Sequence, residues 1–113
     1  MAHMSIYLKI YLANLKTLDF ENKTFLADSI NLIEKFNEKT FDIIYSDPPY
    51  KTDLNNKVLE ILSRKSLLKD DGWLILECSK DEDFSNEIEV NSFELIKEKI
   101  YGDTKVLYLK QKL

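Results

Sequence analysis

The stretch Phe41-Asp-Ile-Ile-Tyr-Ser-Asp-Pro-Pro-Tyr50 limits the possible folds more than any other part of the chain. Its first five residues, up to Tyr45, are mostly apolar, β-branched or aromatic, which is typical of a short strand buried on both faces. Pro48 and Pro49 cannot continue the strand, because proline lacks the backbone N–H and fixes φ. The chain must therefore leave the sheet at the carboxyl end of this strand, which is where open α/β sheets bind their ligands.

Composition sets broader limits. The 113 residues predict one domain, and 44% hydrophobic with 32% charged residues is typical of a soluble globular protein. No apolar run approaches the roughly 20 residues of a membrane span, and no signal peptide is recognised, so we expect a cytoplasmic location. The single cysteine, Cys78, predicts a buried thiol without an internal disulfide. A net charge of −4 argues against a stand-alone nucleic-acid binder, because phosphate contacts favour basic surfaces.

The N-terminal segment predicts a helix. We interpret Met1 to Met4 as an expression remnant and expect the single domain to run from residue 5 to residue 113. From Ser5 to Leu18 apolar residues recur at helical spacing. Ile6 and Ile10 lie outside the main stripe and widen its apolar surface. Either this helix is buried more deeply than average, or it carries a second partner surface.

The rest of the chain alternates between expected strands and helices. Lys23–Ala27 is expected to form a short strand, and Asp28 is expected to cap a helix over Ser29–Phe36. The elements expected after the Phe41–Tyr45 strand are a helix from about Leu54 to Leu67, a turn at Asp71-Gly72, a buried strand Trp73–Cys78, an acidic loop with a short helix from Ser79 to Asn91, and a hairpin of Phe93–Tyr101 and Lys105–Lys112 around Gly102-Asp103.

The motif Asp47-Pro48-Pro49-Tyr50 resembles the catalytic motif of amino-methyltransferases, which methylate adenine N6, cytosine N4 or guanine N2 with S-adenosylmethionine. The resemblance implies that the Asp47 carboxylate and the Pro48 carbonyl accept hydrogen bonds from the target amino group, while Tyr50 stacks on the base. Positioning of this kind suffices for direct methyl transfer, and no covalent enzyme nucleophile is needed. The alternative interpretation is an ordinary turn after a strand.

From Leu12 to the C-terminus the chain resembles the later part of the 16S rRNA guanine-N2 methyltransferase family. The similarity includes the Asp28-Ser29 turn, the motif strand, the Asp71-Gly72-Trp73 turn and the closing hairpin. The motif is specific for amino-methyl transfer, and the remainder is similarity of fold. The resemblance implies an α/β fold: a truncated Rossmann-like class I methyltransferase sheet whose parallel strands end in an antiparallel hairpin.

The cofactor half of this resemblance is incomplete. The family holds the methionine part of S-adenosylmethionine with a glycine-rich turn after the first strand, and the ribose with an acidic residue after the second. Gly72 and Gly102 both follow Asp47, so no glycine-rich turn precedes the motif. The resemblance implies that only the adenine end of the site is present, at Asp28 and Ser29, although Asp28 is equally explained as a helix cap. No metal site is expected.

A sheet truncated in this way would lack two strands between Lys23–Ala27 and Phe41–Tyr45. Either these two strands pair directly, or a second chain covers the open edge. Because open edges and apolar faces are association sites, we expect a homodimer. The sequence leaves open whether the missing part is absent from the gene, was removed, or is supplied by a partner.

Three functions remain open from the sequence. The first is an S-adenosylmethionine-dependent methyltransferase, most similar to the enzymes that modify guanine N2 in 16S rRNA. The second is an adenine-N6 methyltransferase of DNA or RNA, because the motif alone does not select the base. The third is a non-catalytic remnant or assembly module of the same fold, which the missing glycine-rich turn favours for this chain alone.

Overall fold

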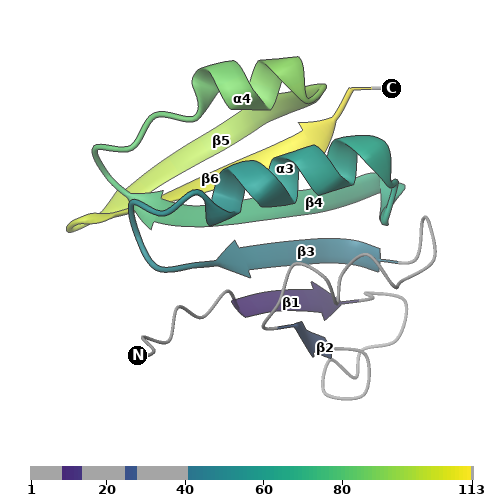
Figure 1. Ribbon diagram of the computed structural model, residues 1–113, viewed down its shortest axis with the longest axis horizontal. Coiled ribbons are helices and arrows are strands. Elements are labelled where there is room, and N and C mark those ends of the chain that lie inside the picture. The colour runs from purple at the N-terminus through teal and green to yellow at the C-terminus, as the bar shows by residue number, and fades with distance from the viewer. Residues whose placement is uncertain (1–8, 14–24, 28–40, 113) are drawn as a thin grey trace.

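The computed structural model describes residues 9–13, 25–27 and 41–112. The described strands form one mixed sheet in the order β2-β1-β3-β4-β6-β5 (Figure 1). In chain order the elements are β1 (Lys9–Ala13), β2 (Phe25–Ala27), β3 (Phe41–Asp47), α3 (Leu54–Arg64), β4 (Leu68–Ser79), α4 (Ser85–Val90), β5 (Phe93–Tyr101) and β6 (Thr104–Gln111). The expected Rossmann-like α/β architecture, with a closing antiparallel hairpin, is therefore confirmed.

The predicted strand over Phe41–Tyr45 is confirmed as β3, and it pairs in parallel with β4, with Ile44 opposite Leu74. Both of these side chains are fully buried, as expected for strands covered on a face by helices. The predicted terminal hairpin is also confirmed. β5 and β6 are joined at Gly102, whose φ of +57° is a conformation that glycine adopts at little cost.

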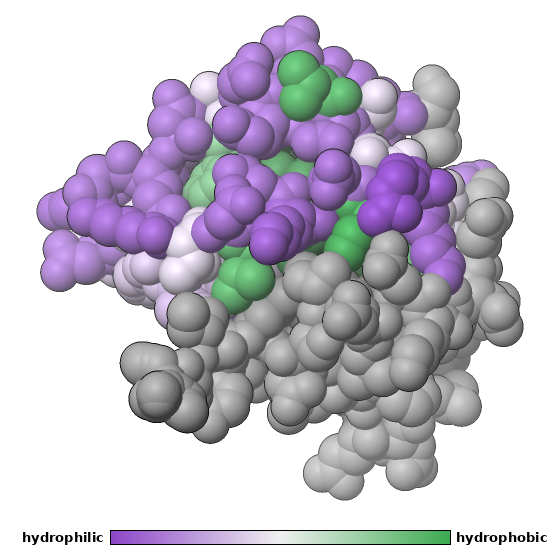
Figure 2. Space-filling view, viewed as in Figure 1, coloured by the Kyte–Doolittle hydropathy of each residue, from purple (hydrophilic) through white to green (hydrophobic). Residues whose placement is uncertain are grey.

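The core lies between the sheet and the helices. α3 presents the predicted apolar stripe to it: Val58, Ile61 and Leu62 are buried, and Leu54 packs against the same cluster. α4, which the sequence predicted as a short helix within an acidic loop, contributes Ile88 to this core. The outer surface over the helices is mostly hydrophilic (Figure 2). The helices are therefore amphipathic covers for one face of the sheet.

The opposite face of β4 and β6 is half-buried and partly aromatic. Trp73 and Tyr108 meet edge to face, with ring centroids 6.4 Å apart. The Lys110 ammonium lies 4.4 Å from the centre of the Trp73 ring, within the range of a cation–π contact. Because side chains alternate along a strand, Glu77 lies on this same face as Trp73.

The predicted turn at Asp71-Gly72 is wrong, because both residues lie inside β4. The register between β3 and β4 shifts here: Phe41 pairs with Leu68, and Ile43 pairs with Trp73. A Cβ on Gly72 would lie 2.9 Å from Leu68 Cδ2 and 3.0 Å from the Asp42 carbonyl oxygen. Glycine is therefore present because the strands approach closely at an irregularity.

The predicted helix over Ser5–Leu18 is also wrong where the structure describes it, because Lys9–Ala13 is the strand β1. The sequence Lys-Ile-Tyr-Leu-Ala contains β-branched and aromatic residues, which suit a strand as well as the helical spacing suits a helix. β1 makes ladder hydrogen bonds to neighbours on both sides, and such tertiary pairing overrides weak local propensity.

β1 also changes the arrangement expected beside β3. It lies between β2 and β3 and is antiparallel to both, with Tyr11 opposite Leu26 on one side and Tyr45 on the other. Direct pairing of Lys23–Ala27 with Phe41–Tyr45 is therefore wrong, although a strand is confirmed at Phe25–Ala27. The open edge on which the homodimer was argued is filled, so dimerisation remains a prediction without that support. The predicted helix Ser29–Phe36 lies outside the described residues.

Candidate active site

The four residues of the motif lie at the carboxyl end of β3. Asp47 is the last residue of the strand, Pro48 is buried, and Pro49 and Tyr50 are exposed. The next residue, Lys51, has a φ of +61°, which is uncommon for a side chain other than glycine. Thr52 Oγ1 donates a hydrogen bond of 2.9 Å to the Pro49 carbonyl and closes the turn. The structure thus brings all four predicted catalytic residues together at the sheet edge where ligands bind in this fold class.

A buried polar link fixes this end of the strand to its neighbours. Ser46 Oγ donates to Asn55 Oδ1 at 2.8 Å, and Asn55 Nδ2 donates to the Glu77 carbonyl oxygen at 3.0 Å. Ser46 and Asn55 are 0% and 2% exposed, so these bonds satisfy groups that would be costly to bury alone. They join β3, the first turn of α3 and β4, and thereby hold the motif against the strand beside it.

The Glu77 carboxylate binds two tyrosine hydroxyls. Tyr45 donates to Glu77 Oε2, and Tyr50 donates to Glu77 Oε1 at 3.0 Å. The Tyr50 hydroxyl also lies 2.6 Å from Thr104 Oγ1 of β6. Tyr45 and Glu77 meet because they extend from the same face of adjacent parallel strands, where Tyr45 is paired with Ile75.

The electrostatics of the site keep both phenols neutral. Burial raises the pKa of Tyr45, and the hydrogen bond to Glu77 and the charges of Glu77 and Asp47 raise it further. For Tyr50, the Thr104 hydrogen bond lowers the pKa, but burial, Glu77 and Asp47 outweigh it, and the pKa is raised. The site therefore combines two acidic side chains with neutral phenol donors. Such a site can accept hydrogen bonds from an amino group, which has only hydrogens to offer.

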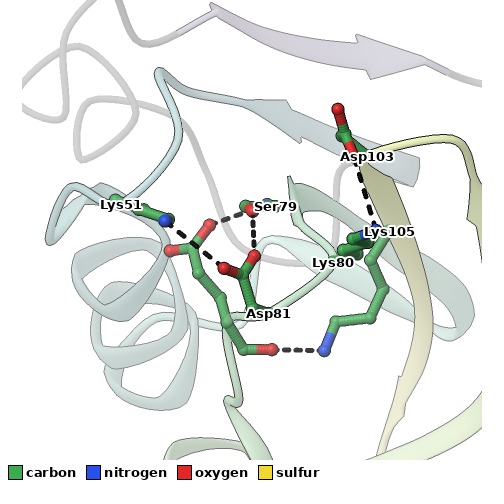
Figure 3. A network of polar contacts seen from close by, with 7 residues as sticks. Lys51, Ser79, Lys80, Asp81, Asp103 and Lys105 are labelled. Atoms are coloured by element: carbon green, nitrogen blue, oxygen red, sulfur yellow. Dashed lines mark hydrogen bonds and ion pairs between the residues drawn. The ribbon is translucent and has the colours of Figure 1, made fainter.

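The loop after β4 lies beside the motif (Figure 3). Its residues are bound to one another: Ser79 N–H donates to Glu82 Oε2 at 2.7 Å, and Ser79 Oγ donates to Asp81 Oδ1 at 2.5 Å. The hydrogen bond from Ser79 lowers the pKa of Asp81, and a backbone hydrogen bond and the nearby Lys51 ammonium lower it further. The ion pair of Lys51 with Asp81, 3.4 Å, connects this loop to the motif, but both side chains are about two-thirds exposed, so its contribution to stability is small.

The same loop is attached to the hairpin. Lys80 pairs with Asp103 at 3.5 Å, and the Lys105 ammonium donates to the Glu82 carbonyl oxygen. Cys78, at the end of β4, is buried as predicted, and burial raises the pKa of its thiol to about 11. It is therefore a protonated thiol of the core and is a poor nucleophile at neutral pH.

The sequence analysis did not identify Tyr45, Glu77, Thr104 or Asn55 as site residues. A signal was present for Glu77 and Asn55, because each is a polar residue within an apolar strand or helix stripe. Asp28 and Ser29, predicted at the adenine end of the cofactor site, lie outside the described residues. Among residues 9–13, 25–27 and 41–112 no group of three or more His, Cys, Asp or Glu side chains is placed to hold a metal ion. In the same part of the chain no helix is long and apolar enough to cross a membrane.

The sheet order, with a polar motif at the carboxyl end of a parallel strand, defines a Rossmann-like α/β domain. The chain belongs to the family described as conserved hypothetical protein 95, whose model matches residues 5–110. It is 35% identical over 72 residues to an uncharacterized methylase of Rickettsia prowazekii, covering 64% of this chain. It is 29% identical over 68 residues to the ribosomal RNA small subunit methyltransferase D of Buchnera aphidicola, covering 59% of this chain. The resemblance to the 16S rRNA methyltransferase family is thereby confirmed, and the target base remains a prediction.

A solved structure supports the same fold. A Haemophilus influenzae protein provisionally described as a methylase superposes with a TM-score of 0.64 and 23% identity, covering 77% of this chain and 53% of its own. The chain spans about a third of the curated relatives it matches, 29% of the Rickettsia protein and 36% of the Buchnera protein.

Proposed function

We propose that this chain carries the target-binding half of an S-adenosylmethionine-dependent N-methyltransferase that acts on an exocyclic amino group of a nucleic-acid base. The observation that supports the proposal most directly is the position of Asp47-Pro48-Pro49-Tyr50 at the carboxyl end of β3, beside the Glu77 carboxylate. Membership of a family with methylase-named relatives supports the same reaction class.

The roles of the residues follow from the chemistry of an aromatic amine. The lone pair of such a nitrogen is delocalised into the base and is a poor nucleophile. Hydrogen bonds from the amino group to the Asp47 carboxylate and the Pro48 carbonyl would hold the nitrogen with its lone pair directed out of the ring plane. Tyr50 would stack on the base, a contact worth about 1–3 kcal/mol for aromatic platforms. When bound, S-adenosylmethionine supplies the methyl group as an electrophilic sulfonium.

The described residues fit the target side of this site better than the cofactor side. A backbone that approaches a cofactor closely needs glycine. In the described part of the chain, Gly72 lies within β4 and Gly102 lies in the turn of the β5–β6 hairpin, so neither belongs to a glycine-rich turn that follows a parallel strand. Asp28 and Ser29 remain proposed contacts to the adenine end. We therefore assign none of the described residues to the binding of the methionine part of S-adenosylmethionine.

Guanine N2 in 16S rRNA is the proposed target, and such a substrate implies a cytoplasmic enzyme. The supporting observation is the Buchnera relative, whose name specifies the RNA of the small ribosomal subunit. Adenine N6 of DNA or RNA is the alternative within enzymes, because the motif serves either base. A non-catalytic assembly module is the alternative from another class, and the lack of glycine on the cofactor side favours it.

The test is methyl transfer from radiolabelled S-adenosylmethionine to small-subunit RNA, using the longest natural chain that contains this segment. Asp47→Ala should lower turnover by about 100-fold or more, because it removes the acceptor that orients the amino group. The exposed Asp71→Ala at the far end of β4 is the matched control and should retain activity. Undiminished transfer by Asp47→Ala would refute the role of the motif. Mass analysis of the digested RNA distinguishes methylated guanine from methylated adenine, and absence of transfer by the unmodified chain favours the assembly module.

A further inference from the structure

The Tyr50 hydroxyl is bound from two strands at once. It lies 3.0 Å from Glu77 Oε1 of β4 and 2.6 Å from Thr104 Oγ1 of β6, although Tyr50 follows β3. A phenol has one hydrogen to donate, and an ionised carboxylate can only accept. The Tyr50 hydrogen therefore goes to Glu77, and the Thr104 hydroxyl donates its hydrogen to the Tyr50 oxygen.

Glu77 is itself held at both ends. Its second carboxylate oxygen, Oε2, accepts a hydrogen bond from the Tyr45 hydroxyl. Its backbone carbonyl oxygen accepts a hydrogen bond from Asn55 Nδ2. Its backbone is paired with Val106 in the sheet. Thr104 is fixed by its place in the ladder, opposite Ser79. The two groups that bind Tyr50 are thus parts of a rigid sheet, whereas Tyr50 lies on the connection between β3 and α3.

We infer that Glu77 and Thr104 are positioning residues that fix the Tyr50 ring in the orientation from which it stacks on the target base. The inference rests on the proposed function and deepens it. Tyr50 is 39% exposed, so part of the ring is available while its hydroxyl is fixed. A ring fixed before binding loses less rotational freedom when a base stacks on it. Because its hydroxyl already makes two hydrogen bonds, Tyr50 contacts a base through the face of its ring and not through hydrogen bonds to the polar groups of the base.

The first experiment measures the positioning without any ligand. The chain is labelled with ¹³C at the tyrosine Cζ, and the Tyr50 resonance is assigned by its loss in Tyr50→Phe. In Glu77→Gln the Tyr50 phenol should ionise at lower pH than in the wild type, because a negative charge beside it is removed. In Thr104→Val it should ionise at higher pH, because a donor to the phenol oxygen is lost, whereas Thr104→Ser should behave as the wild type.

Glu60→Gln is the matched control, since it removes one negative charge from the exposed face of α3. An unchanged Tyr50 titration in both Glu77→Gln and Thr104→Val would overturn the inference. If Glu77→Gln fails to fold, as judged from the amide spectrum, the test rests on Thr104→Val and Thr104→Ser. Both replacements are close to threonine in size, so they should leave the packing of the hairpin unchanged.

The second experiment tests the base. A guanine-containing RNA tetranucleotide is titrated into the labelled chain while the Tyr50 ring resonances are followed. Stacking should shift them in the wild type, and binding should weaken by on the order of tenfold in Glu77→Gln. Equal binding by the two proteins would overturn the inference. If the tetranucleotide leaves Tyr50 unmoved in the wild type while the substitutions still change its titration, the anchoring by Glu77 and Thr104 stands and the proposed stacking fails.

Discussion

Ser46 of β3 donates a buried hydrogen bond of 2.8 Å to Asn55 of α3, and the Asn55 side chain donates a second hydrogen bond to the Glu77 carbonyl oxygen. Asn55→Ala should therefore lower the free energy of unfolding by about 2–3 kcal/mol, because it leaves a hydroxyl and a carbonyl buried without partners. Urea denaturation measures this. Asn86→Ala at the exposed start of α4 is the control and should change stability by less than about 0.5 kcal/mol. An equally small change for Asn55→Ala would mean that water satisfies the two groups.

The raised pKa of Tyr45 predicts a loss of stability in alkali. Burial, followed by Glu77 and Asp47, raises its pKa in the folded state above the ordinary value near 10. The corresponding stabilisation is complete below pH 10 and is lost as the pH rises through the folded-state pKa. Tyr45→Phe should lower stability at pH 8 and flatten its decline above pH 10, as measured by denaturant titration at each pH. Tyr101→Phe, at an exposed position, is the control. A parallel decline in wild type and Tyr45→Phe would contradict the assignment.

Gly72→Ala should destabilise the fold by about 1–3 kcal/mol, the usual cost of overpacking. The added Cβ would lie 3.0 Å from two carbonyl oxygens, those of Asp42 and Lys69, and the backbone cannot yield as a flexible side chain would. Thermal unfolding measures the effect. Asp71→Ala, one residue earlier and exposed, should be close to neutral. A neutral Gly72→Ala would mean that the irregular pairing of β3 and β4 relaxes freely.

S-adenosylmethionine should bind this 113-residue chain weakly, with a Kd in the millimolar range, about −4 kcal/mol. The reason is the lack of a glycine-rich turn before Asp47, which would hold the methionine part of the cofactor. Isothermal titration calorimetry measures the affinity. Micromolar binding would show that other residues hold the cofactor.

Sedimentation equilibrium tests the predicted homodimer. A mass near 13.3 kDa at tens of micromolar would indicate a monomer and refute it.

Much of the fold after residue 40 could be predicted from the sequence. The apolar run before two prolines identified β3, the repeat of apolar residues identified α3, and the alternating pattern around Gly102 identified the hairpin. Each of these signals is local, because the residues that favour the element and the residues that end it are neighbours in the sequence. The motif is equally local, because its four residues are consecutive, and their catalytic roles remain a prediction.

The elements that were missed depend on residues far away in the chain. Lys9–Ala13 is a strand because β2 and β3 lie on both sides of it, and its own spacing favours a helix equally well. Asp71-Gly72 has the composition of a turn, but pairing with β3 keeps it within β4. The carboxylate of Glu77 is identified as part of the site only when Tyr45 and Tyr50 are placed beside it. Hydrogen bonds across the sheet leave little trace in the order of residues.

β1 occupies the position beside β3 at which another chain would have to pair in order to complete this domain. Hydrogen bonds to β1 occupy the side of β3 that faces away from β4, with pairs from Lys9 opposite Asp47 to Ala13 opposite Ile43. A strand from another molecule can pair with β3 at this position only if it displaces β1. Complementation would therefore be a strand exchange in which the incoming strand competes with β1. The rate of this exchange would be limited by the detachment of β1 from β3. Once the incoming chain is in excess, the rate would no longer depend on its concentration.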